Sequence, residues 1–160
     1  ILDIGRTEGA QFEQAKNIDL VEFIKYKTND YNMLAAKKNI TIKFSSNVSS
    51  LQMMIQETLF NQILQNFVQN AIKFTPNGKT IKIKLKKIDD KVILNVIDEG
   101  IGIDENIDVF APFKKVGKEN GVGLGLYLAK IASDALNAKI SIKNREDGKT
   151  GAIAKLELTL

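Results

Sequence analysis

The sequence contains neither cysteine nor histidine. Without cysteine the chain has no disulfide bonds and no thiol chemistry. Without histidine it cannot supply a histidine-based triad, a histidine general base, a histidine zinc ligand or a phosphorylated histidine. Any reaction of this chain that needs an imidazole must therefore take it from another domain or another protein.

Long apolar runs are also missing. No stretch of about 18 consecutive apolar residues occurs, and the N-terminal residues do not follow the signal-peptide pattern. The 160 residues are 44% hydrophobic and 26% charged, a composition typical of one globular domain. Because the first residue is Ile1 rather than methionine, we expect a fragment of a longer protein.

The charge balance is mild, with 23 Lys and Arg against 19 Asp and Glu and a net charge of +4. Lysines gather in residues 79–87 and 113–120, and contact with nucleic acid is one explanation of such clusters. In 79–87, however, Ile and Leu alternate with Lys, which is the pattern of a half-buried strand with a solvated face. We therefore expect this domain to contact neither nucleic acid nor a membrane.

Periodicity predicts a mixture of helices and strands. Apolar residues at helical spacing predict helices over 19–38, 57–74 and 122–136, with Asp19 as a cap and residues 75–78 as a turn. Alternating residues predict strands over 40–46, 51–55, 79–88, 91–97, 138–144 and 151–159. This order favours an α+β fold, a two-layer α/β sandwich in which about three helices cover one face of a mixed, mostly antiparallel sheet.

Two asparagines and a lysine share one face of the helix predicted over 57–74. Asn66 and Asn70 lie about one turn apart, and Lys73 follows three residues later. A plain solvated helix face would look the same. An amide oxygen is also a suitable ligand for Mg²⁺, however, and a lysine ammonium is suited to phosphate.

Two glycine-containing segments follow that helix. Asp98 ends an apolar strand before Gly100 and Gly102, so it either closes a turn or offers a carboxylate where a flat base can approach the backbone. In 120–130 glycines alternate with Val and Leu before a helix, which is a weak signal of an anion site. We expect the leucines of that segment in the core rather than at a ligand.

The order and spacing of these motifs are more specific than any one of them. NFVQNAIKF at 66–74, Asp-x-Gly-x-Gly from Asp98, FAPF at 110–113 and GVGLGL at 121–126 together resemble the catalytic ATP-binding domain of sensor histidine kinases. That domain has the Bergerat-type fold, which it shares with gyrase, heat-shock chaperone and mismatch-repair ATPases. The resemblance covers nearly the whole chain. Residues 1–16 resemble the end of a dimerisation helix with its linker, and residues 17–160 resemble the catalytic domain.

The resemblance implies a site for ATP and Mg²⁺ along the asparagine helix. Asn70 is implied to hold the Mg²⁺ that bridges the phosphates. Asn66 and Lys73 are implied to contact phosphate or its water shell, as further catalytic residues. Phe74 is implied to lie against the purine.

The resemblance also implies residues for the adenine and for a lid. Asp98 is implied to bind the adenine amino group, in a pocket shaped by Gly100, Gly102 and Ile103. Phe110 and Phe113 are implied to anchor a mobile lid. The lid side of the nucleotide site is implied to include Lys115, Lys118, Gly121, Gly123, Leu124, Gly125 and Leu126. Lys115 or Lys118 is the candidate contact of the terminal phosphate.

One position separates this chain from the hydrolytic members of the superfamily. Those members carry a glutamate one turn before the metal-binding asparagine, where this chain has Asn66. A carboxamide cannot take a proton at neutral pH, so no base activates water here. The resemblance therefore implies slow hydrolysis, with transfer of the γ-phosphoryl group to a histidine on a dimerisation domain of the parent protein or another kinase. A response regulator is implied downstream. We expect the domain in the cytoplasm, where ATP is, with a parent protein that is membrane-anchored or not.

The sequence departs from the family pattern at three points. It has no phosphoacceptor histidine, the segment between Phe113 and Gly121 is shorter than the usual lid, and Ala152 stands where serine or threonine is common. These departures keep open a second interpretation, a degenerate nucleotide-binding or scaffold module that signals through protein contacts. A serine kinase of the anti-sigma-factor type has the same fold, but residues 1–14 favour an upstream dimerisation helix.

Overall fold

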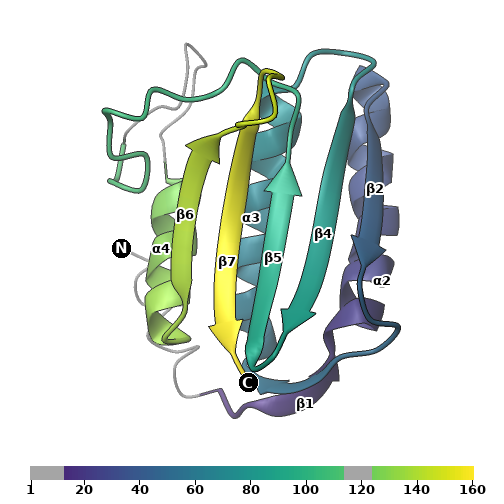
Figure 1. Ribbon diagram of the computed structural model, residues 1–160, viewed down its shortest axis with the longest axis vertical. Helices are drawn as coiled ribbons and strands as arrows, with labels where there is room; N and C mark the ends of the chain where they lie inside the picture. Colours follow the sequence, from purple (N-terminus) through teal and green to yellow (C-terminus); the bar gives the residue numbers. More distant parts are fainter. Residues whose placement is uncertain (1–12, 114–123) are drawn as a thin grey trace.

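The computed structural model describes residues 13–113 and 124–160, and Figure 1 shows a sheet standing in front of a layer of helices. The helices of this part are α2 (Leu20–Ala35), α3 (Glu57–Phe74) and α4 (Gly125–Ala135), with a 3-10 turn at Ala36–Lys38. The strands are β1 (Lys16–Asp19), β2 (Thr41–Ser46), β3 (Gln52–Ile55), β4 (Thr80–Ile88), β5 (Lys91–Ile97), β6 (Lys139–Asn144) and β7 (Ala152–Thr159). No helix within the described ranges is both long and apolar enough to cross a bilayer.

The main sheet has five strands in the order β2-β4-β5-β7-β6. β2 and β4 are parallel, and α3 lies in the connection between them. All other neighbours are antiparallel, and β4 and β5 form the predicted hairpin across Asp89, whose φ is 56°. The predicted α+β fold with a mixed, mostly antiparallel sheet is confirmed.

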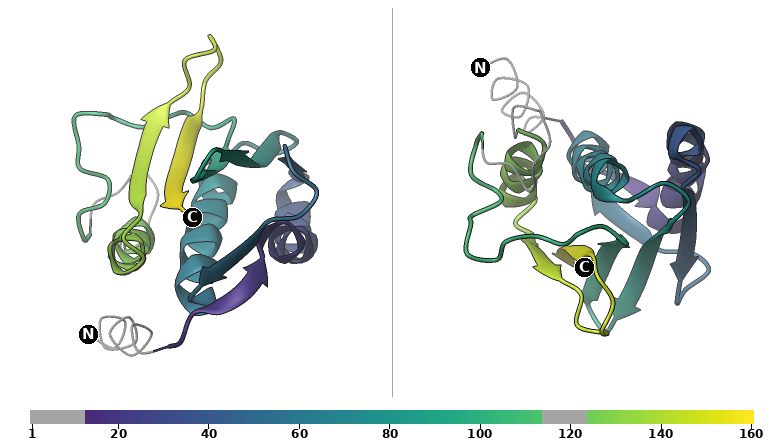
Figure 2. Two further views of the ribbon diagram at one scale, coloured as in Figure 1. Left: turned by 60° about the horizontal axis from the view of Figure 1, so that its bottom comes forward. Right: turned by 90° about the horizontal axis from the view of Figure 1, so that it is seen from above.

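The three helices all cover the same face of this sheet, as the two views in Figure 2 show. Strand residues alternate between buried positions that face the helices and more exposed positions on the other face. Seven residues of α3 at helical spacing are buried: Leu59, Phe60, Ile63, Leu64, Phe67, Val68 and Ala71. Each of the larger side chains in this set, all except Ala71, contributes roughly 1.5–3 kcal/mol when fully buried, so α3 is held firmly and its polar stripe has a fixed position.

A second sheet of two strands lies at the lower end of Figure 1, where β1 pairs with β3. β1 was not predicted, because its four residues are too few to show an alternating pattern. β3 falls within the strand predicted over 51–55, but it pairs with β1 and stays outside the main sheet. β1 begins at Lys16, the last residue of the predicted linker, and residues 1–12 of that linker lie outside the described residues.

Local sequence explains where two of the helices begin and end. The Oδ1 of Asp19 accepts the N–H groups of Val21 (3.0 Å) and Glu22 (3.4 Å), which confirms the predicted cap of α2. Thr75 ends α3 in an extended conformation (ψ 131°), because a residue before proline disfavours helix. Gly78 then takes a φ of 83°, and the turn leads directly into β4.

Candidate functional site

Asp98 follows β5 at the end of the central strand, and only 7% of its surface is exposed. Its Oδ1 accepts the backbone N–H groups of Gly100 and Ala152, each at 2.9 Å. Its backbone is fixed as well. The N–H of Asp98 donates to the carbonyl of Ala152 (3.0 Å), and its carbonyl accepts from Nη1 of Arg145 (3.0 Å). The carboxylate is therefore held in one orientation.

Burial raises the pKa of Asp98 above its usual value of 3.8, although the N–H donors of Gly100 and Ala152 and the charge of Arg145 lower it in part. Within the described part of the chain, both hydrogen bonds to this carboxylate reach Oδ1 and none reaches Oδ2. Buried carboxylates with a perturbed pKa are concentrated at functional sites. Asp98 is thus an acceptor that the protein orients, and its Oδ2 takes no hydrogen bond from residues 13–113 and 124–160.

The segment after Asp98 is clamped against the β6–β7 connection. The Oδ1 of Asn144 accepts the N–H of Ile103 (2.7 Å), and its Nδ2 donates to the carbonyl of Ile103 (2.9 Å). At Gly151 the φ is 135°, and a Cβ there would overlap the carbonyl oxygen of Asp98. Only glycine fits position 151, and this close contact keeps the Asp98 backbone in place.

Three residues that build this region were not predicted from the sequence: Asn144, Arg145 and Lys38. The Nζ of Lys38 donates to the carbonyls of Ile72 (2.7 Å) and Lys73 (3.3 Å), so it caps the C-terminal end of α3. These three residues reach partners 34 to 47 positions away in the chain. Local patterns carry no signal for such long-range contacts.

The loop at Gly100 rests on the C-terminal end of α3. A Cβ at Gly100 would lie 2.6 Å from the carbonyl oxygen of Phe74, so this close backbone approach requires glycine. Phe74 is half-buried beside the loop, and the Nζ of Lys73 lies 5.6 Å from its ring centroid. Asp98 and the end of the asparagine helix, predicted to serve the same ligand, are therefore brought together.

Asn70 and Asn66 lie one and two turns before Phe74 on α3, and both are half-buried. At about 1.5 Å per residue, Asn66 lies about 12 Å from Phe74 along the helix axis. The other end of this stripe meets α4, because the Oδ1 of Asn66 lies 3.5 Å from where a Cβ on Gly125 would be. The stripe runs from the start of α4 to the loop that contains Asp98.

The residues implied to anchor a lid differ in burial. Phe110 is half-buried and packs against the core, and its N–H donates to Oδ1 of Asp108 (3.1 Å). Phe113 is 70% exposed and has a φ of 65°. Lys115, Lys118, Gly121 and Gly123 lie outside the described residues, as do the first residues of the helix predicted over 122–136.

Three further residues of the implied site lie at or near the core or make room for a neighbouring side chain. Leu126 is buried in the core (5% exposed), as its apolar pattern predicted, and Leu124 is half-buried just before α4. Gly102 has a φ of 83°, and a Cβ there would lie 2.5 Å from Oδ1 of Asn144. Gly102 therefore makes room for the clamp on Ile103.

The side chains of the α3 stripe near Asn70 are neutral amides and one lysine. In residues 13–113 and 124–160, no group of three acidic side chains is arranged to hold a metal ion. Amide oxygens are suitable Mg²⁺ ligands but bring no charge. The donor set therefore fits a divalent cation that arrives with a ligand carrying its own negative charge, as phosphates do.

The loop that follows the buried Asp98 therefore lies against the end of the asparagine helix, and the fold around this pair of elements is shared with known proteins. Residues 55–160 match the family described as histidine kinase-, DNA gyrase B-, and HSP90-like ATPase. The chain belongs to this family. It is a histidine kinase-like ATPase domain, and the inferred membership is confirmed.

The curated relatives of this ATPase domain include sensor kinases. The sensor protein KdpD of Clostridium acetobutylicum is 36% identical over 128 residues, which are 76% of this chain and 14% of that protein. The autoinducer 2 sensor kinase/phosphatase LuxQ of Vibrio vulnificus is 28% identical over 158 residues, which are 90% of this chain and 18% of that protein. The chain thus spans less than a fifth of the length of these relatives.

Solved structures of histidine kinases share the fold. The catalytic domain of the histidine kinase ThkA superposes with a TM-score of 0.81 at 30% identity, covering 91% of this chain and 95% of that one. ThkA in complex with the response regulator protein TrrA gives 0.77 at 29% identity, covering 91% and 41%. Full-length ShkA in complex with AMPPNP gives 0.84 at 25% identity, covering 98% and 34%.

Proposed function

We propose that this histidine kinase-like ATPase domain binds ATP with Mg²⁺ and transfers the γ-phosphoryl group to a histidine outside this chain. One observation carries the proposal. Asp98 is buried, is held through Oδ1 by two backbone amides, and receives no hydrogen bond on Oδ2 from the described residues. The AMPPNP in the ShkA structure supports ATP as the ligand.

Asp98 selects the base in this proposal. The adenine amino group donates an N–H to Oδ2, a charge-assisted hydrogen bond in a site with little water. Guanine presents a carbonyl oxygen at the corresponding place, so two acceptors would face each other. The loop at Gly100 offers bare backbone to one face of the base, and Phe74 lies against the purine.

The α3 stripe serves the phosphates. Asn70 would hold Mg²⁺ through its amide oxygen, and Asn66 and Lys73 would contact phosphate or its water shell. The bound ion would supply positive charge that offsets the charge of the phosphates. On the lid side the residues proposed to close over the phosphates are Lys115, Lys118, Gly121, Gly123, Leu124 and Gly125, with Phe110 and Phe113 as anchors. The side chain of Leu126 is buried in the core and takes no part in this closure.

Asn66 decides between hydrolysis and transfer. Its position on α3 is the one from which a carboxylate would activate water in hydrolytic relatives, and an amide cannot accept that proton. The γ-phosphoryl group therefore remains available to a better nucleophile, the imidazole of a phosphoacceptor histidine. This chain positions the nucleotide and stabilises its charge, and the nucleophile comes from a dimerisation domain of the parent protein or of another kinase.

Because another domain supplies the histidine, the proposed function also implies partners for this domain. A phosphohistidine made in this way passes its phosphoryl group to a response regulator, and the ThkA structure with TrrA supports such a partner. Because ATP and the regulator are intracellular, we propose that the domain works in the cytoplasm. A degenerate module that signals through protein contacts remains the second candidate, favoured by Ala152 in place of serine or threonine.

The first test is a calorimetric titration with a non-hydrolysable ATP analogue, with and without Mg²⁺, against the matching GTP analogue. We expect binding that depends on Mg²⁺ and selects adenine. The domain is then incubated with labelled ATP and a histidine-containing dimerisation domain from a related sensor kinase, and we expect label on the histidine with slow release of phosphate. An absence of nucleotide binding would favour the scaffold, and brisk hydrolysis by the domain alone would contradict the role of Asn66.

A further inference from the structure

The face of the main sheet turned away from the helices is strongly basic. In register across the strands, three rows on this face read Lys43-Lys82-Ile97-Ile153-Lys143, Ser45-Lys84-Asn95-Lys155-Ser141 and Lys86-Ile93-Glu157-Lys139. These rows, which we name the lysine face, hold seven lysines and a single acidic residue. That residue, Glu157, already lies 3.9 Å from Lys139 and 4.0 Å from Lys91.

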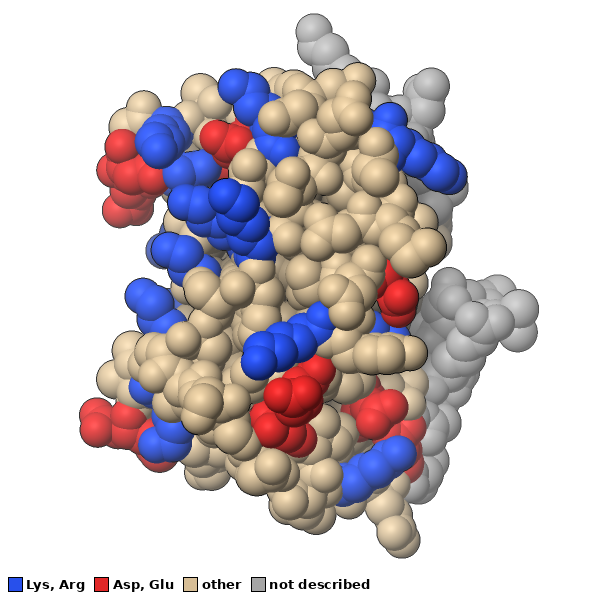
Figure 3. All heavy atoms as spheres, turned by 90° about the vertical axis from the view of Figure 1, so that its right-hand side faces the viewer, with Lys and Arg blue, Asp and Glu red and all other residues tan. Residues whose placement is uncertain are grey.

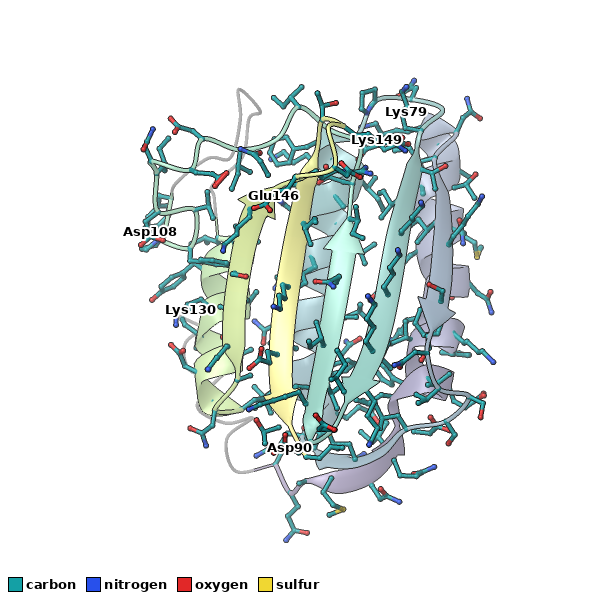
Figure 4. All side chains as sticks on the ribbon, viewed as in Figure 1. Lys79, Asp90, Asp108, Lys130, Glu146 and Lys149 are labelled. Carbon is teal, nitrogen blue, oxygen red and sulfur yellow. The ribbon has the colours of Figure 1, made fainter. Side chains whose placement is uncertain are left out.

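At the upper end of the sheet, basic side chains lie together with acidic ones. Figure 3 shows Lys and Arg side chains along the left margin of the molecule, which is the front of the sheet in Figure 1, with acidic side chains at the two ends of that margin. Two hollows of about 210 and 410 Å³ are both lined by Lys82, Arg145 and Lys149; Glu99 also lines the first, and Glu146 and Asp147 line the second. Because Arg145 is paired with Asp147 (2.7 Å), the positive charge that distinguishes this face comes from its lysines. Figure 4 shows Lys149 beside Lys79, and these two residues line a third hollow of about 550 Å³.

A solvated strand face explains the lysines of β4 alone, but it does not explain their convergence with lysines of β2, β6 and β7. Lys43 and Lys82 lie directly opposite each other on neighbouring strands, an arrangement of like charges that destabilises a sheet. Between Lys84 and Lys155, the Oδ1 of Asn95 is buried and has no hydrogen-bond partner in the described residues. The face is thus arranged less favourably for the isolated domain than for a bound anionic partner.

We propose that the lysine face docks an acidic protein segment that carries apolar residues between its carboxylates. Half-buried Ile97 and Ile153 lie side by side between Lys82 and Lys143 in the first row, and half-buried Ile93 lies beside Lys86 in the third. Apolar positions therefore alternate with lysines across this face, which matches a segment whose apolar residues alternate with carboxylates. The three rows contain no aromatic side chain on which a nucleic-acid base would stack. A protein partner therefore fits this face better than a nucleic acid does.

The size of the lysine face predicts a weak, reversible contact. The three rows span about five residues of each strand at ~3.3 Å per residue, and with four inter-strand spacings of ~4.8 Å they give roughly 300 Å². Stable complexes bury about 800 Å² on each partner, so this face suits a transient encounter governed by charge. Docking here does not rest on the proposed phosphotransfer, because the lysine face and the α3 stripe lie on opposite sides of the sheet.

The test uses the whole domain and a fluorescent peptide in which glutamates alternate with leucines. Anisotropy is measured at low and at physiological salt for the natural sequence and for Lys82→Glu/Lys84→Glu. The matched control is Lys25→Glu/Lys37→Glu, which makes the same change in net charge at exposed positions of the α2 region. A labelled single-stranded oligonucleotide of equal charge and anionic vesicles are titrated in parallel.

We expect the peptide to bind the natural sequence in a salt-dependent manner, and the Lys82/Lys84 variant to bind about tenfold more weakly. We expect the control variant to change affinity by less than about twofold and the oligonucleotide and vesicles to bind more weakly than the peptide.

Equal losses in both variants would show attraction by net charge alone and overturn the proposal. Preference for the oligonucleotide or vesicles, or no peptide binding at low salt, would also overturn it. A melting curve of each variant shows whether the fold is retained, and Lys82→Gln/Lys84→Gln provides a milder version should the charge reversal unfold the domain.

Discussion

The two ends of the polar stripe on α3 are held in different ways. At the Asp98 end, hydrogen bonds from Gly100, Ala152 and Arg145 fix the carboxylate and its backbone, and Asn144 clamps the loop that follows. At the other end Asn66 and Asn70 are half-buried, and neither amide side chain forms a hydrogen bond to any other described residue. The protein itself orders the first end, and the proposed ligand would order the second.

Because the two ends are held differently, stability and ligand binding should depend on different residues. At the Asp98 end the groups are oriented during folding, so a ligand binds there without further ordering. At the Asn70 end the amide side chains form no hydrogen bond within the described residues, so their hydrogen-bonding groups remain available to the proposed phosphate and metal. Substitutions that break the close contacts or hydrogen bonds at the Asp98 end should therefore change stability, and those at the Asn70 end should change ligand binding and transfer with the fold intact.

Asn70→Ala should give the largest functional effect. Removing the proposed metal-holding amide should lower phosphotransfer on the order of 10³-fold, since preorganised charge stabilisation carries most of this reaction. The free energy of unfolding should change by less than about 0.5 kcal/mol, as at other positions without a structural partner. Transfer assays and urea melts check both, with Gln69→Ala, an exposed amide on the same helix, as the control. Normal Mg²⁺-dependent transfer by Asn70→Ala would remove the proposed role.

Gly151→Ala should give the largest structural effect. The new Cβ would meet the carbonyl of Asp98 at a φ of 135°. Strain from positive φ and overpacking together should lower the free energy of unfolding by about 4 kcal/mol. Gly148→Ala is the matched control, because Gly148 also has positive φ (82°) but nothing lies within 4 Å of its added Cβ. Chemical denaturation should show a loss of about 1–2 kcal/mol for Gly148→Ala. Equal losses for both would show that φ alone decides and that the close contact costs nothing.

Asp98→Asn should weaken adenine binding while the fold remains intact. The Oδ1 of asparagine still accepts the N–H groups of Gly100 and Ala152, so the loop geometry is kept. At the second position an N–H₂ group replaces the acceptor, and losing a charge-assisted hydrogen bond should weaken the ATP analogue about 10- to 100-fold. Calorimetry of both proteins measures this change, and a guanine analogue shows whether selectivity falls too. An unchanged dissociation constant would place the adenine elsewhere.

Most of the fold followed from the sequence because its helices and strands show strong local periodicity. The limits predicted for α3 and β5 match those observed, since the turn at 75–78 and the hairpin at Asp89 mark their ends chemically. β1 was missed because four residues carry too little pattern. The separate pairing of β3 with β1 depends on residues far apart in the chain, and periodicity does not contain that information.

Only part of the candidate site could be predicted from the sequence. Asp98, Asn70 and their neighbours stand in short motifs with distinctive spacing, so the resemblance named them as candidates. The supporting contacts come from Asn144, Arg145 and Lys38, whose partners are distant in sequence. The structure also gives Ala152 a task that its side chain does not reveal, because its backbone N–H holds Asp98. Any residue except proline can supply that donor, so replacing the usual serine or threonine leaves this hydrogen bond unaffected.

The smallest expected effect concerns the pH dependence that Asp98 creates. Its folded-state pKa is raised above 3.8, mainly by burial, so between these two pKa values the folded protein binds more protons than the unfolded chain. The contribution of Asp98 to stability is therefore present below pH 3.8 and is lost as pH rises through the folded-state pKa.

The affinity for the nucleotide should have the opposite pH dependence and fall in acid, since the ionised carboxylate is the better acceptor and its protonation at low pH weakens the adenine contact. Glu13, Asp19 and Asp147 have lowered pKa values, so their contributions to the stability of the protein are lost in acid. The pH dependence of the total stability therefore combines effects of opposite sign. The difference between the natural sequence and Asp98→Asn isolates one residue and cancels the titration of the nucleotide itself. Acid should raise the relative stability of the natural sequence and lower its affinity advantage. If both differences fell together in acid, Asp98 would be bound to a cation within the fold and not poised for a ligand.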